Sequence, residues 1–427
     1  MTQIEDHPLR YQLSNELHAR PFPSLKAPCH AVYLAIKKTQ DAANRDRAED
    51  RAHLIDLLDR FGAQHPQPDA THFFGEIGRY SLKWENHTEF VTYTIFSDGV
   101  TERPFDPAAF DVFPEDWLAK MPGARIASAL IRVEKIPGQD VDLFERLHKW
   151  FVPDSLACSW VLDRSAMMAS DFRIDNSGHA RFALFVQPDA GRRRVGRIVQ
   201  RLTEIEIYKA MSMLGLPRAR GLSRKMGEID PKLSGLVEHI ATGNHAPEET
   251  LDELLAISAR LENLQAQSAF RFGATGAYEA LVHQRIEVLR EERYGGRQTF
   301  REFMMRRFDP AMRTVMSTRE QLRAMTERAA RAGDLLRTQV DVSRSAQNQK
   351  LLESMDKRAD LQLRLQETVE GLSVVAISYY AVSLAAYAAY PVASPLGLSK
   401  GLLTALLTPV VVLVVWMMIR RIRQKMH

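Results

Sequence analysis

The hydrophobic pattern is most pronounced near the C-terminus, where two long stretches lack charged residues. Residues 371–390 and 401–419 contain no Asp, Glu, Lys or Arg, and residues 391–400 separate them. A helix of about 20 apolar residues crosses the hydrocarbon core of a bilayer. The pattern therefore predicts two transmembrane helices joined by an outer turn, in preference to two buried helices of a soluble core.

Basic residues predict the orientation of these two spans. Four of them follow the second span, whereas the outer turn holds only Lys400, and such a bias places the basic end in the cytoplasm. The four are Arg420, Arg421, Arg423 and Lys425. Two crossings return the chain to its starting side, and the polar first ten residues do not resemble a signal peptide. We therefore expect a multi-pass protein of the bacterial inner membrane with both termini cytoplasmic.

Residues 1–220 alternate strand and helix signals, which predicts a cytoplasmic α+β domain of mixed α/β type. Strands are expected at residues 29–37, 79–84, 89–96, 125–135, 156–162, 167–174 and 181–186, and helices at 41–61, 141–150 and 191–214. Gly215 and Pro217 are typical of the end of a helix, so we expect the last of these helices to stop there.

Strand signals disappear after residue 221, and the rest of the chain reads as helical. We expect a helical region over residues 221–308 and a long stalk helix over 309–370. The stalk runs directly into the first span, because Asp309 and Pro310 suit a helix start and no proline follows until Pro391. A basic tail, residues 420–427, ends the chain.

The stalk carries an apolar stripe with alternating spacings of three and four, as a coiled coil requires. Its members are Leu322, Met325, Ala329, Ala332, Leu336 and Val340. Acid–base pairs four residues apart, such as Glu327 with Arg331 and Asp360 with Arg364, support the exposed faces. We therefore expect this helix to pack along its length on other helices and to mediate homo-oligomerisation.

A second stripe follows the first span and has two interpretations. Small and hydroxylated residues recur there at spacings of three and four: Ser373, Ala376, Tyr380, Ser383, Tyr387 and Tyr390. A hydroxyl in hydrocarbon needs a partner, so this face is expected to meet another helix or water. Ordinary helix packing and a pore lining both fit. Neither span nor the turn contains an acidic residue, so a cation path would depend on hydroxyls and backbone carbonyls.

Composition and motifs argue against several functional classes. The net charge is +4, from 57 basic and 53 acidic residues, which is too small to indicate a nucleic-acid partner. Cys29 and Cys158 are the only cysteines and show no metal-ligand spacing. Phosphate-binding, dinucleotide-binding and zinc-protease motifs are absent, so we expect no enzyme activity, no catalytic residue, no cofactor and no metal site.

Three polar clusters remain as weaker candidates. One lies near the N-terminus and comprises His7, Arg10, Asn15, Glu16, His18 and Arg20. It suits a ligand site or, preferably, a salt-bridged helix. His87 with Glu85 and Glu89 suits a divalent-ion patch or, preferably, a solvated turn. A run of three arginines, residues 192–194, begins a helix where the helix dipole disfavours cations.

Three segments carry a resemblance to a known family. HPLRY at residues 7–11, ELHARPF at 16–22 and EGLSVVAISYY at 370–380 resemble a bacterial family of uncharacterised membrane-anchored proteins, domain of unknown function family 3422. This resemblance covers essentially the whole chain and implies the membrane topology, without an activity or a site.

The order of elements is also similar to that of CorA-type magnesium channels. Those channels join an N-terminal α/β domain, a stalk helix, two spans and a basic tail, and five subunits assemble with the first spans lining the pore. A Gly-Met-Asn motif forms their selectivity site, whereas this chain has Tyr390-Pro-Val-Ala393 at the equivalent place. Magnesium selectivity is therefore not implied.

Two functions follow from the sequence. The first is an oligomeric, CorA-like ion transport protein, whose ion is not specified. The second is a membrane-anchored scaffold or regulatory protein in which the hairpin only tethers a cytoplasmic domain. Both make the lipid bilayer a partner and favour a homo-oligomer.

Overall fold

The computed structural model describes residues 4–11, 13–14, 22–68, 70–137, 140–242, 247–393 and 399–426. The chain divides into two units. Residues 1–244 with 252–332 form the first unit, and residues 245–251 with 333–427 form the second. The first unit contains a mixed sheet with its covering helices, and the second contains the long C-terminal helices.

A nine-stranded sheet organises the first unit, with the order β2-β3-β4-β1-β5-β8-β7-β6-β9. Strands β5 and β8 pair in parallel, and the other neighbouring pairs are antiparallel. The strands are β1 (Cys29–Lys37), β2 (His72–Ile77), β3 (Tyr80–Asn86), β4 (Val91–Asp98), β5 (Ala124–Lys135), β6 (Ala157–Val161), β7 (Ala166–Ser170), β8 (Ala180–Val186) and β9 (Glu292–Arg293).

The central strand β1 shows why the sheet has two apolar faces. Side chains of a strand alternate between faces, and β1 is buried on both. Ala31, Tyr33 and Ala35 join one core, whereas Val32 and Leu34 join the core on the opposite face. The strand predicted at residues 29–37 is confirmed with the same limits.

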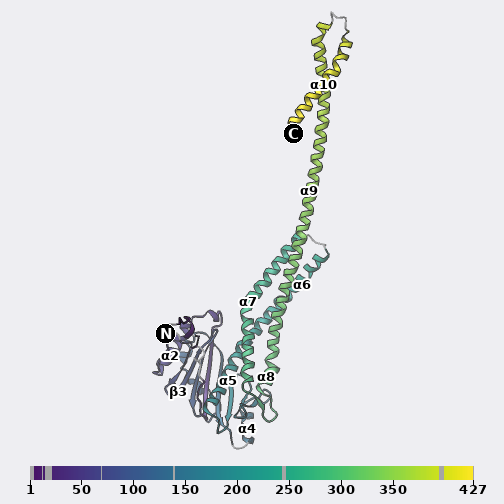
Figure 1. Ribbon diagram of the computed structural model, residues 1–427. Coiled ribbons are helices and arrows are strands. Elements are labelled where there is room, and N and C mark those ends of the chain that lie inside the picture. The colour runs from purple at the N-terminus through teal and green to yellow at the C-terminus, as the bar shows by residue number, and fades with distance from the viewer. Residues whose placement is uncertain are drawn as a thin grey trace. The chain divides into compact units, whose positions relative to one another are not determined.

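Helices cover both faces of the sheet (Figure 1). Helices α2 (Arg47–Arg60), α3 (Glu115–Leu118) and α4 (Asp140–Trp150) contribute to one core, with two short 3-10 helices, η1 (Ala42–Asn44) and η2 (Pro107–Val112), in the connecting segments. Helix α5 (Arg192–Met213), the C-terminal part of α7 (Pro247–Glu287) and α8 (Phe300–Arg307) contribute to the other. The first unit is thus a layered α/β/α structure, in agreement with the mixed α/β class expected from the sequence.

The predicted helix end before Gly215 is confirmed, because α5 ends at Met213, and a separate helix, α6 (Gly215–Thr242), begins directly after it. A Cβ at Gly215 would lie 2.4 Å from the Thr275 hydroxyl oxygen of α7. The glycine therefore also permits close packing of α6 on α7. Pro217 falls in the first turn of α6, where its missing N–H costs no helical hydrogen bond.

Helix α9 (Asp309–Ala393) confirms the long uninterrupted stalk. All six residues of its predicted apolar stripe, Leu322 to Val340, are buried. Two of the predicted pairs on its exposed faces are present, Glu327 with Arg331 at 3.8 Å and Asp360 with Arg364 at 3.7 Å. The helix extends through Pro391 to Ala393, so the predicted outer turn is shorter than expected, and residues 394–398 lie outside the described residues.

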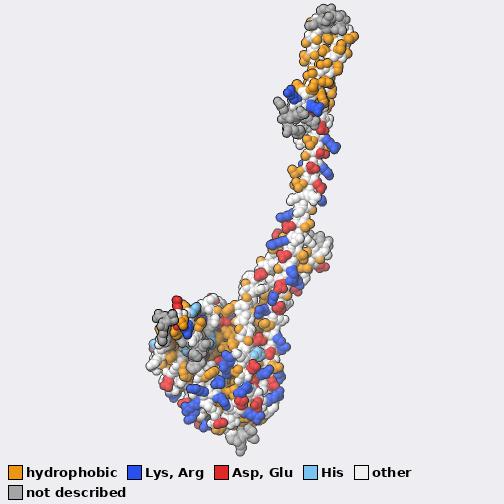
Figure 2. All heavy atoms as spheres, in the orientation of Figure 1, with side chains coloured by type: hydrophobic (Ala, Val, Ile, Leu, Met, Phe, Trp, Pro, Cys, Tyr) orange, Lys and Arg blue, Asp and Glu red, His pale blue; other side chains and the backbone are white. Residues whose placement is uncertain are grey.

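Helix α10 (Lys400–Met426) is the last element and runs beyond the predicted second span. Helices α9 and α10 are each long and apolar enough to cross a membrane. Figure 2 shows hydrophobic side chains on the paired ends of these two helices, and mixed charges along the preceding part of α9. Val382 of α9 and Val415 of α10 are buried, which is consistent with packing of one helix on the other.

Candidate functional site

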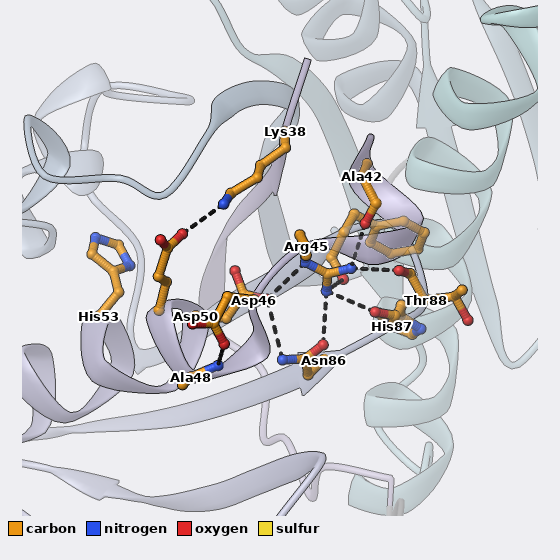
Figure 3. A network of polar contacts seen from close by, with 12 residues as sticks. Lys38, Ala42, Arg45, Asp46, Ala48, Asp50, His53, Asn86, His87 and Thr88 are labelled. Atoms are coloured by element: carbon orange, nitrogen blue, oxygen red, sulfur yellow. Dashed lines mark hydrogen bonds and ion pairs between the residues drawn. The ribbon is translucent and has the colours of Figure 1, made fainter. Parts of the chain in front are cut away.

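A polar turn between β3 and β4 is the most elaborate polar cluster described in the first unit (Figure 3). Arg45 contacts this turn and is almost fully buried. Its guanidinium donates to Asp50 at 2.7 Å, to the Asn86 side chain at 2.7 Å and to four main-chain carbonyls, namely those of Ala42, His87, Thr88 and Phe90. One arginine thus fixes the backbone of the whole turn.

The pair of Arg45 and Asp50 is a buried ion pair, with both side chains 2 % exposed. Burial raises the pKa of Asp50 above its usual range, while Arg45 and Asn86 act in the opposite direction. Removing one member of such a pair leaves an uncompensated buried charge and costs about 3–5 kcal/mol. The turn is therefore a rigid part of the fold.

Glu89 shows that this turn is not the solvated loop that the sequence favoured. Its side chain is only 2 % exposed and forms a close ion pair with Arg271 of α7, and Tyr278 donates to it at 3.3 Å. Lys37 lies 4.0 Å from the same carboxylate. The sequence could not reveal this contact, because Glu89 and Arg271 are 182 residues apart.

The three residues suggested as a divalent-ion patch in this turn, Glu85, His87 and Glu89, are divided between two sites. Glu89 is bound by Arg271, whereas Glu85 and His87 line a cavity beneath α5. Within the described residues, no group of three His, Cys, Asp or Glu side chains is arranged to hold a metal ion.

The N-terminal polar cluster is only partly described. Arg10 pairs with Asp6, and both are exposed or half-buried. Asn15, Glu16, His18 and Arg20 lie outside the described residues. The three arginines at residues 192–194 are exposed at the start of α5.

The second candidate site is the stripe on the apolar C-terminal part of α9. Ala376, Tyr380 and Tyr387 are exposed, and Ser373 and Ser383 are half-buried. The side chain of Tyr390 lies outside the described residues. The described stripe residues thus share one largely uncovered face of the helix.

A different face of α9 is buried. Ser378, Val382 and Ala386 are 5–8 % exposed, and they recur at intervals of four. Val415 of α10 is buried as well, which places the inter-helix contact on this face. Helix α10 therefore leaves most of the predicted stripe uncovered, apart from Tyr387, whose ring centre lies 4.9 Å from the Lys400 Nζ atom.

Two stripe hydroxyls have partners within their own helix. Ser373 donates to the Val369 carbonyl at 2.8 Å, and Ser383 donates to the Tyr379 carbonyl at 2.9 Å. Such bonds to the preceding turn satisfy a serine in an apolar environment. These two hydroxyls therefore do not by themselves require a second helix or water, and the expectation that the stripe meets one of them stays a prediction.

The spacing of this stripe continues toward the N-terminus of α9, where the residues on every face of the helix from 341 to 369 are exposed. At the same spacings of three and four, the preceding residues are Leu352, Met355, Ala359, Gln362, Gln366 and Val369, all exposed and uncharged. Leu352 is 65 % exposed and Met355 is 59 % exposed. This continuation of the stripe was not predicted, because the charged residues around it were interpreted as a solvated helix surface. Its spacing of three and four residues is nevertheless visible in the sequence.

The basic residues predicted to set the topology lie at the end of α10. Arg420 lies over the Trp416 ring, with its guanidinium carbon 5.1 Å from the ring centre. Arg421 is exposed, and the side chains of Arg423 and Lys425 lie outside the described residues. An aromatic residue beside arginines is typical of the interface between a membrane and water.

Comparison with known proteins identifies a family whose function is unknown. No match was found among functionally curated proteins. One family, described as a protein of unknown function (DUF3422), matches residues 5–426, which is nearly the whole chain. The chain therefore belongs to the DUF3422 family.

Proposed function

We propose that the chain forms a parallel homo-oligomer in the bacterial inner membrane, in which the first spans surround a common axis and provide a path for ions. One observation carries this proposal. An uncharged stripe on α9, from Leu352 to Tyr387, is left largely uncovered by α10, which contacts it through Lys400 over the Tyr387 ring.

The spacing of this stripe fits association with further copies of α9. Repeats of three and four residues are the pattern of helices that supercoil around one another. Every copy inserts into the membrane with the same orientation, so the copies are parallel and their stripes are in register. Burying an exposed leucine, methionine or valine contributes about 1.5–3 kcal/mol per side chain, which favours assembly along the stripe.

The same stripe supplies the polar groups of the proposed path. Gln362 and Gln366 would face the axis in the stalk, and Ser373, Tyr380, Ser383 and Tyr387 would face it within the span. None of these groups is acidic, so ion binding would be weak and would depend on amide, hydroxyl and carbonyl oxygens. This arrangement resembles the architecture of CorA-type channels without their Gly-Met-Asn motif.

A second candidate function is a membrane-tethered interaction protein that oligomerises but does not conduct. The hydrogen bonds of Ser373 and Ser383 to their own helix favour it, because satisfied hydroxyls can pack against a neighbouring helix without water. The two functions share the oligomer and differ in whether water enters the axis.

The oligomer is tested with one substitution on the stripe and one beside it. Gln366→Glu places one carboxylate per subunit at the common axis, where like charges repel, so the mass of the detergent-solubilised complex should fall. Gln347→Glu makes the same chemical change at an exposed position outside the stripe and should leave the mass unchanged. A monomeric wild-type protein, or equal masses for all three proteins, would contradict the proposed interface.

Conduction is tested by cysteine accessibility and ion flux. The native Cys29 and Cys158 are buried and their pKa values are raised by burial, so a Cys29→Ser, Cys158→Ser background removes two already slow sites. Single cysteines at Ala376 and Ser383 should react with a water-soluble thiol reagent, because thiolate formation needs water. Cysteines at Val375 and Leu384 should not react. If no interior cysteine reacts with the reagent and no ion flux into liposomes is measured, the function is that of a membrane-tethered interaction protein that does not conduct.

The proposed orientation is tested separately. We expect a reporter that is active only in the cytoplasm to function when fused after His427, because the basic residues of α10 favour that side. Activity of a periplasm-specific reporter at the same position would contradict the proposed cytoplasmic location of this end.

A further inference from the structure

Charged and uncharged residues lie on different sides of α9 between residues 350 and 370. Successive residues of an α-helix are rotated by about 100°, because one turn takes 3.6 residues. Seven of the nine charged residues in this segment therefore fall within an arc of about 120°. Apart from Arg358 and Glu370, the other side of the helix is uncharged over about 200°. The charged arc consists of Lys350, Glu353, Asp356, Lys357, Asp360, Arg364 and Glu367.

The uncharged side is wider than contact with one neighbouring helix requires. An apolar stripe about 100° wide is enough for a helix to pack on one surface. The stripe that begins at Leu352 occupies about this width between residues 352 and 369. A second apolar set, Leu361, Leu365 and Leu372, lies beside it, and we call this set the flank. Its side chains are 65 %, 69 % and 66 % exposed.

Neither the rest of the described chain nor lipid covers the flank. All residues from 341 to 369 are exposed. The charged arc runs along the same length of α9, so this segment does not lie in hydrocarbon. The helix continues without a break to Ala393, so the segment does not bend away from the predicted span to lie along a membrane surface. Exposed apolar patches of this kind mark contacts with other protein surfaces.

A second copy of the chain matches this surface along its whole length. Membrane insertion orients every copy in the same way, so neighbouring α9 helices are parallel and in register. The flank of one copy then lies level with the stripe of the next copy and with Leu363, which adjoins the opposite edge of the stripe and is 58 % exposed. A dimer through the stripe alone would leave the flank in water. Two neighbours per helix cover both surfaces and leave only the charged arc in water.

We propose that each α9 helix contacts two neighbouring copies, with the flank of one copy packed against Leu363 and the adjoining edge of the stripe on the next. The two surfaces in contact differ, so the contact is head-to-tail, and rotation about a common axis closes it into a ring. The ring contains at least three copies, because a dimer gives each helix only one neighbour. This ring rests on the proposed function, since it requires the parallel oligomer, and it adds a second contact surface to that oligomer.

The experiment measures the mass of the full chain in detergent over a range of protein concentrations. We expect the wild type to have the mass of three or more copies. Leu365→Glu places a carboxylate on the flank and should raise the concentration at which half of the complex dissociates at least about tenfold, because the burial of a leucine is lost. Gln349→Glu is the control, because Gln349 is exposed beside the charged arc, and it should leave this concentration unchanged.

Leu361→Glu is a second flank variant and should have the same effect as Leu365→Glu. Tryptophan fluorescence shows whether each variant is folded. A wild-type dimer would overturn the ring and leave the proposed parallel oligomer in place, whereas a monomer would contradict the proposed function and the ring with it. A complex of three or more copies that neither flank variant weakens would overturn the flank as a contact surface.

Discussion

Acidification should destabilise the first unit through one buried histidine, His53 of α2. His53 is 6 % exposed and stacks on Trp117, with ring centres 3.8 Å apart. Its Nδ1 lies 3.0 Å from the Tyr93 hydroxyl and its Nε2 lies 3.1 Å from the Trp117 carbonyl. A carbonyl only accepts, so Nε2 carries the proton of the neutral ring and Nδ1 accepts from Tyr93.

Burial lowers the pKa of His53 from 6.5 to about 4. The unfolded chain therefore binds a proton between these two pH values that the folded chain does not bind. Stability falls as the pH falls through this range and is fully restored above pH 6.5. Linkage gives a loss of about 2 kcal/mol between pH 7 and pH 5, which approaches about 3 kcal/mol below both pKa values.

The measurement is urea unfolding of the full chain at pH 7 and pH 5, followed by tryptophan fluorescence. His53→Gln replaces the imidazole with a side chain that does not titrate and that still offers a donor and an acceptor. We expect the stability of the wild type to fall between the two pH values by about 2 kcal/mol more than that of the variant. Other titrating groups, including the buried His179, are common to both proteins and cancel in this difference. Equal losses in the two proteins would refute the assignment to His53.

Two further substitutions, each paired with a control, test contacts that stabilise the first unit. Gly196→Ala in α5 places a Cβ 1.7 Å from a facing main-chain oxygen, so we expect a loss of about 1–3 kcal/mol in thermal unfolding. Gly221→Ala is the control, because its added Cβ meets no atom within 4 Å, and it should stabilise α6 by up to about 1 kcal/mol. Equal effects of the two substitutions on stability would contradict the close contact at Gly196. Arg271→Ala leaves Glu89 buried without its main partner and should cost about 3–5 kcal/mol, whereas Arg260→Ala breaks an exposed pair and should cost less than about 1 kcal/mol. A small effect at Arg271 in the same unfolding assay would show that Lys37 alone compensates Glu89.

The sequence by itself determined the elements whose signal is local. The nine-residue strand β1 is apolar from Ala31 to Ile36, as suits a strand buried on both faces, and its limits were predicted correctly. The long helix α9 was predicted because prolines are absent from its interior and its apolar residues follow a helical spacing. The two candidate spans were predicted for the same reason, since length and hydropathy need no tertiary context.

Elements that depend on contacts with distant parts of the chain were harder to predict from the sequence. Strand β2 was missed because it lies at the edge of the sheet, where its side chains are half-buried and its alternation is weak. The end of α5 before Gly215 was predicted, whereas the close packing of Gly215 against Thr275 on another helix was not.

Only the tertiary structure decided the polar sites. It brings Glu89 to Arg271, a pair that is far apart in the chain and carries no local spacing signal. It also shows which face of α9 is covered by α10 and which remains free, because a stripe at helical spacing looks the same whether it is buried or exposed. Periodicity fixes which residues share a face, and the partner of that face is set by contacts between segments distant in sequence.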